Sequence, residues 1–65
     1  MKSYSPKEVI EILIRNGWYE KRSRGSHHQF VKDGCKNIVT ISISKKDIPI
    51  GTLKSISKQS GIVFK

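Results

Sequence analysis

The chain has 65 residues and one cysteine. That length allows one domain with one small core, expected over residues 1–65. The lone cysteine excludes an intramolecular disulfide, which makes a reducing cytoplasm the simplest location. Its 13 Lys and Arg residues against 5 Asp and Glu give a net charge of +8, which indicates a polyanionic partner, most often nucleic acid; the one apolar segment near the N-terminus, VIEILI, is too short for a membrane span, so no membrane association is expected.

Residues 5–17, SPKEVIEILIRNG, carry a full set of helix signals. Ser5 suits the N-cap, Glu8 completes a capping box with it, Pro6 suits the first helical position and Gly17 ends the helix. Five apolar side chains cover an arc of roughly 200° on this helix: Val9, Ile10, Ile12, Leu13 and Ile14. That arc is wider than a helix on a small sheet needs, so part of it is available to a partner.

Three strands are expected next, over residues 18–24, 27–32 and 37–44. The turn DGCK separates the second strand from the third and predicts a hairpin, with Gly34 free to take a positive φ. In the third strand three residues are predicted to face the helices, and their neighbours to face the other side of the sheet. The three are Val39, Ile41 and Ile43, and the neighbours are Ile38, Thr40 and Ser42.

The segment IPIGTLKSISKQSG, residues 48–61, predicts a second helix. Pro49 lies near its start, Gly61 ends it, and an apolar face is expected from Ile50, Leu53 and Ile56. The predicted order is therefore α-β-β-β-α, an α+β domain.

The stretch RGSHHQF, residues 24–30, holds two adjacent histidines. Alternation along a strand places His28 on the same face as Phe30, the natural core residue, and turns His27 to the open face. We expect His28 to lie at the edge of the core with a backbone hydrogen-bond partner. His27 is the better candidate for chemistry, although the residues alone describe an ordinary surface histidine equally well.

The remaining candidates are aromatic or basic. Trp18 is expected to cap the core, with a platform for a nucleic-acid base as the alternative. The first 20 residues are balanced in charge, so the excess of basic residues lies in residues 21–65. Four of these basic side chains lie near the histidines or follow the third strand: Arg22, Arg24, Lys45 and Lys46. They either contact phosphate groups or are solvated surface charges without a partner role. No second cluster of His, Cys or carboxylates accompanies the histidines, so neither a metal nor another cofactor is expected.

Three motifs together resemble one family: GW after the first helix, RGSHHQF, and KKDIPIGTLKSISKQSGI at the end. Across essentially the whole chain they are similar to the HicA, or YcfA-like, toxins of bacterial type II toxin-antitoxin pairs. The resemblance implies a fold like that of a double-stranded-RNA-binding domain, with a three-stranded antiparallel sheet and two helices on one face. It also implies an mRNA interferase neutralised by a HicB-type antitoxin. Lys21 departs from the family, whose members often have an apolar residue there, and this leaves the register of the first strand open.

The resemblance also suggests roles for individual residues. The glycine and first histidine of the family's box, which matter for toxicity, correspond to Gly25 and His27. His27 is predicted to act as general acid or base in metal-independent cleavage of mRNA, with the nearby basic residues positioning phosphate. Gly25 either lets the RNA backbone approach closely or provides a bend at the strand edge. The alternatives are a non-catalytic RNA-binding module of the same fold and a protein whose role is to be held by an acidic antitoxin.

Overall fold

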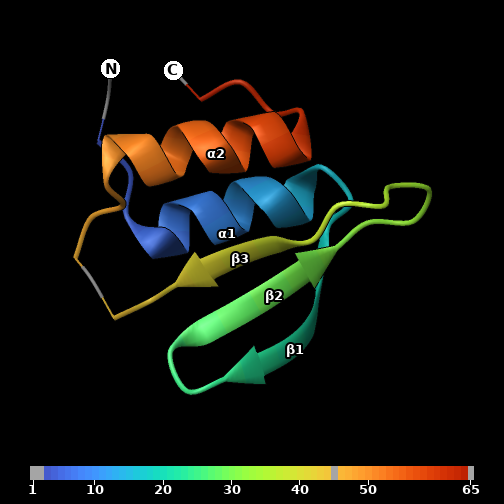
Figure 1. Ribbon diagram of the computed structural model, residues 1–65, viewed down its shortest axis with the longest axis horizontal. Coiled ribbons are helices and arrows are strands. Elements are labelled where there is room, and N and C mark those ends of the chain that lie inside the picture. Colours follow the sequence, from blue (N-terminus) through green and yellow to red (C-terminus); the bar gives the residue numbers. More distant parts are fainter. Residues whose placement is uncertain (1–2, 45, 65) are drawn as a thin grey trace.

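The computed structural model describes residues 3–44 and 46–64 and has the predicted order of elements (Figure 1). These are α1 (Pro6–Arg15), β1 (Tyr19–Arg24), β2 (His27–Val31), β3 (Val39–Ser42) and α2 (Ile50–Ser60). The three strands form an antiparallel sheet in the order β1-β2-β3, and both helices pack on one side of it. The fold is therefore α+β and resembles a double-stranded-RNA-binding domain, as predicted.

Both ends of α1 follow from local chemistry. The Ser5 hydroxyl accepts a hydrogen bond from the Glu8 backbone N–H at 3.2 Å, and the Ser5 backbone N–H donates to the Glu8 carboxylate at 3.1 Å. This reciprocal capping box satisfies two donors that a helix start leaves unpaired. Asn16 is the C-cap, and Gly17 follows with a φ of 92°. The predicted helix signals are thus confirmed.

The strands β1 and β2 are joined by the two-residue loop Gly25-Ser26. Gly25 has a φ of 59° and Ser26 does not have a positive φ, a combination typical of a type II′ turn with glycine at its first central position. The pairing of β1 with β2 shifts register between Glu20 and Arg22, so Lys21 is an extra residue in a β-bulge. All six residues of β1 are exposed, and the strand contributes its edge but no core side chain.

The core lies between the sheet and the helices. Its buried apolar side chains come from both helices, from β2 and β3, and from the connecting segments: Tyr4, Val9, Leu13, Trp18, Phe30, Val39, Ile41, Ile48, Leu53, Ile56 and Phe64. Trp18 is 2% exposed, so it caps the core as expected and its alternative use as a base platform is wrong. Tyr4 and Phe64 pack edge to face with ring centroids 5.4 Å apart and bring the two ends of the described chain together.

Two isoleucines predicted to lie on the inner apolar faces are not buried. Ile50 is 58% exposed because α2 starts at this residue, and the inward position belongs to Ile48, whose N–H donates to the Tyr4 carbonyl at 2.9 Å. Ile43 is 48% exposed because β3 ends at Ser42, although it still lines a hollow beside α1 with Ile10. The other predicted core positions of these two elements are buried, and Gly61 ends α2 in the left-handed conformation.

Candidate nucleic-acid interface

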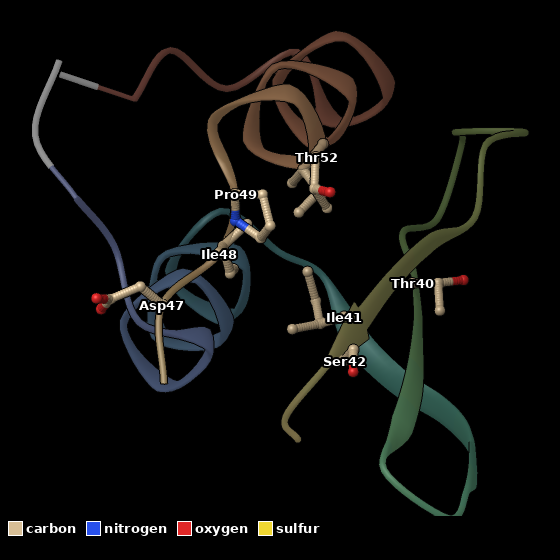
Figure 2. A pocket seen from close by; sticks show the side chains of 8 residues that line it. Thr40, Ile41, Ser42, Asp47, Ile48, Pro49 and Thr52 are labelled. Atoms are coloured by element: carbon tan, nitrogen blue, oxygen red, sulfur yellow. The ribbon is translucent and has the colours of Figure 1, made fainter. Parts of the chain in front are cut away.

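The side of the sheet away from the helices carries mostly polar side chains, whereas the helix side carries the apolar core residues of β2 and β3. In an antiparallel sheet, residues directly opposite each other project to the same face. Figure 2 shows the alternation in β3, where Ile41 points toward the helices and Thr40 points away from them. Register then gives the residues of the other side, which we call the open face: Tyr19, Arg22, Arg24, His27, Gln29, Val31, Thr40 and Ser42.

His27 lies in the middle of one row on the open face. It pairs with Arg24 of β1 on one side and with Ser42 of β3 on the other. Cross-strand partners have Cβ atoms about 4.5–5.5 Å apart, so Arg24 and Ser42 flank His27 along the row. The Ser42 hydroxyl shares a hydrogen bond with that of Ser44 at 3.0 Å. His27 is exposed, as a residue that meets a large substrate must be.

His28 points to the helix side and meets a different partner from the one predicted. Its Nδ1 lies 3.1 Å from Glu20 Oε1, and its side chain is 21% exposed. Its Nε2 is buried and has no hydrogen-bond partner among the described residues. The position at the edge of the core is confirmed, but the predicted backbone partner is wrong: the ring is held by a carboxylate across the strand pair.

The bulge at Lys21 decides which side chains of β1 reach the open face. Strict alternation puts residues three apart on opposite faces. The extra residue instead leaves Tyr19 opposite Val31 and Arg22 opposite Gln29, both on the open face, and leaves Glu20 on the side of His28. Lys21, the residue that left the register of the first strand open, is therefore the bulge residue itself.

Two of the four predicted phosphate contacts lie beside His27. Arg22 and Arg24 are exposed and occupy neighbouring rows of the open face. Lys46 is exposed in the connection from β3 to α2, outside the sheet, and Lys45 lies outside the described residues. Among the described candidates, Arg22 and Arg24 are therefore the ones that share the open face with His27.

Gly25 takes its conformation from the turn. At a φ of 59° an L side chain is rarely tolerated, whereas a Cβ built there meets nothing within 4 Å. The two roles predicted for Gly25 are close approach of the RNA backbone and a bend at the strand edge. The bend is the one that this backbone conformation requires.

His27 does not line the pocket nearest to it, although its β3 partner Ser42 does. A pocket of about 100 Å³ lies between β3 and the start of α2, where Ile41, Ile48 and Thr52 are among its lining residues (Figure 2). That volume is below the roughly 300–1,000 Å³ typical of small-molecule sites. Because His27 is exposed on the open face, a ligand that reaches it lies across that face.

Neither a metal site nor a membrane-spanning helix is found in residues 3–44 and 46–64. No group of three or more His, Cys, Asp or Glu side chains in these ranges could hold a metal ion. No helix there is long and apolar enough to cross a membrane.

Sequence reasoning missed Tyr19, which the register places on the open face. The bulge that brings it there is a property of the two paired strands, so the sequence of β1 alone does not show it.

Comparison with known proteins identifies the family of the chain. A family model described as "HicA toxin of bacterial toxin-antitoxin" matches residues 6–62, from the first residue of α1 to just beyond α2. No curated protein sequence matches the chain.

Proposed function

The chain belongs to the HicA toxin family and is the toxin of a toxin-antitoxin system; from this premise we propose that it is an mRNA interferase, a metal-independent endoribonuclease that cleaves through His27. The observation that carries the proposal is the row Arg24, His27, Ser42 on an exposed face of the sheet. An imidazole between a cation and a hydroxyl is suited to a phosphodiester, which needs proton transfer and charge neutralisation at one place.

Metal-independent cleavage of RNA requires only proton transfer and neutralisation of negative charge. A base removes the proton of a ribose 2′-hydroxyl, the oxygen attacks the adjacent phosphorus, and the bond to the 5′-oxygen breaks as that oxygen takes up a proton. The products are a 2′,3′-cyclic phosphate and a 5′-hydroxyl. Imidazole can accept or donate a proton near neutral pH, so His27 serves as general base or general acid. Arg22 and Arg24 offset the charge that develops on the phosphorane.

Cleavage of a long single-stranded RNA in the presence of EDTA tests this function. We expect the parent chain to cut and His27→Ala to lose about 10²- to 10⁴-fold in rate while remaining folded. His28→Ala is the matched control: it should keep most of the activity and unfold at lower temperature, because it leaves Glu20 without its partner. Undiminished cutting by His27→Ala contradicts the proposal. Binding of RNA without cutting by the parent identifies a non-catalytic RNA-binding module instead.

We also propose that a HicB-type antitoxin neutralises this toxin. Ile10 and Ile43 line a shallow hollow beside α1, and Ile14, one helical turn from Ile10, is exposed. An acidic protein with an apolar contact surface complements both this hollow and the basic open face. The complex is expected to form without RNA and to inhibit cleavage.

A further inference from the structure

Tyr19 is the exception among the aromatic side chains. Four of the five aromatic residues, all within the described ranges, are buried in the core. Tyr19 is 50% exposed. It pairs with Val31 on the open face, at the end of the sheet remote from the Gly25-Ser26 loop. An aromatic ring beside guanidiniums on an exposed sheet is the arrangement on which single-stranded nucleic acids stack their bases.

The ring of Tyr19 is held in place. Its hydroxyl donates a hydrogen bond to the Asp33 carboxylate at 3.1 Å. A ring already fixed by its tip loses little freedom when a base stacks on it, which favours binding. The carboxylate of Asp33 repels a phosphate but not a neutral base, so this end of the open face suits a base and the Arg22 and Arg24 rows suit the backbone.

The spacing along β2 relates the ring to the histidine. Val31, the partner of Tyr19, is four residues from His27, or about 13 Å at about 3.3 Å per residue. Arg22 lies opposite Gln29 in the row between them. An extended single strand, with nucleotides spaced about twice as far apart as the 3.4 Å of a duplex strand, spans this distance in about two nucleotides.

We propose that Tyr19 is a base-stacking subsite of the toxin, which holds a base of the RNA about two nucleotides from the phosphate at His27 while Arg22 contacts the backbone between them. The inference rests on the proposed function in one respect, that RNA lies across the open face. The subsite recognises the flat face of a base and not its hydrogen-bonding edge, so it positions the strand for cleavage with only a weak preference among bases.

Binding of a short single-stranded RNA to chains that carry His27→Ala, followed by fluorescence anisotropy, tests the subsite without cleavage. We expect Tyr19→Phe to bind within about twofold of its parent because the ring remains. Tyr19→Leu should bind about 5- to 150-fold more weakly, the range for loss of one stacked base. Ile50→Leu is the matched control: it changes an exposed side chain on α2, away from the open face, and should leave the affinity for RNA unchanged.

The position of the subsite relative to the cut is tested with the active chain. Single abasic nucleotides are placed in turn on each side of a mapped cut, and cleavage should fall most when the missing base is about two nucleotides away. Tyr19→Leu should abolish that sensitivity.

Equal binding and equal abasic sensitivity in Tyr19→Leu and the parent overturn the subsite even if His27 proves catalytic. An RNA that binds through Tyr19 but is never cut overturns the proposed nuclease and leaves the subsite standing. A parent chain that does not bind RNA overturns both.

Discussion

At the scale of single residues, the pair of Tyr19 and Asp33 makes a prediction that depends on pH. The hydrogen bond to the Asp33 carboxylate, and then its negative charge, raise the pKa of Tyr19 above its usual value near 10. The folded chain therefore holds the phenol proton more tightly than the unfolded chain. The resulting stabilisation is present below pH about 10 and is lost as the pH rises through the pKa of the folded state.

Substitution of Asp33 separates the two causes. Asp33→Asn removes the charge but keeps an acceptor, so the pKa of Tyr19 should fall part of the way, and Asp33→Ala should bring it back near 10. Ultraviolet titration of the phenolate measures this, with Tyr19→Phe identifying which transition belongs to Tyr19. An unchanged titration in Asp33→Ala contradicts the hydrogen bond.

Residue-level prediction from sequence worked where local alternation decides the outcome. Phe30 is buried, His27 is exposed and His28 lies between, as the two-residue period of a strand requires. Prediction from sequence failed where contacts between distant parts of the chain determine the position of a side chain. The carboxylate that holds His28 comes from another strand, and Ile48 takes the place of Ile50 because the segment before α2 is bound to Tyr4.

At the scale of elements, the capping box makes α1 the helix best determined by its own sequence. Ser5→Ala removes the acceptor for the Glu8 N–H and should cost about 1 kcal/mol of the free energy of unfolding, which for a chain of this size lowers Tm by about 4–8 °C. Thermal unfolding followed by circular dichroism measures it. Lys7→Ala, an exposed first-turn position, serves as the control and should leave Tm nearly unchanged. A Tm equal to the parent's in Ser5→Ala means that the cap carries no stability.

The helices and the order of strands could be predicted because their signals are contiguous in the chain. The bulge could not be, since a bulge is a property of two paired strands, and β1 has no apolar period to fix its pairing. Which residues of β1 lie on the open face, Tyr19 among them, depended on the bulge at Lys21.

At the scale of the whole molecule, the charge of +8 predicts a strong effect of salt on RNA binding. For single strands the logarithm of affinity falls with the logarithm of salt concentration with a slope of about −0.7 for each phosphate contact. Replacing Arg22 and Arg24 together by Gln should make that slope shallower by about 1.4, because two contacts are lost. Lys58→Gln, which removes an exposed charge from α2 instead, should leave the slope unchanged. Equal slopes in both variants mean that the basic charge of the sheet does not contact RNA.

The exposure of all six residues of β1 has a consequence for how such toxins diversify. The core is complete without any side chain from this strand, yet the strand supplies Tyr19, Arg22 and Arg24 to the open face. Mutations here escape the packing constraints that make most substitutions costly. We therefore expect β1 to be the part of the protein in which affinity for RNA can change, over generations or by directed evolution, while the core stays fixed.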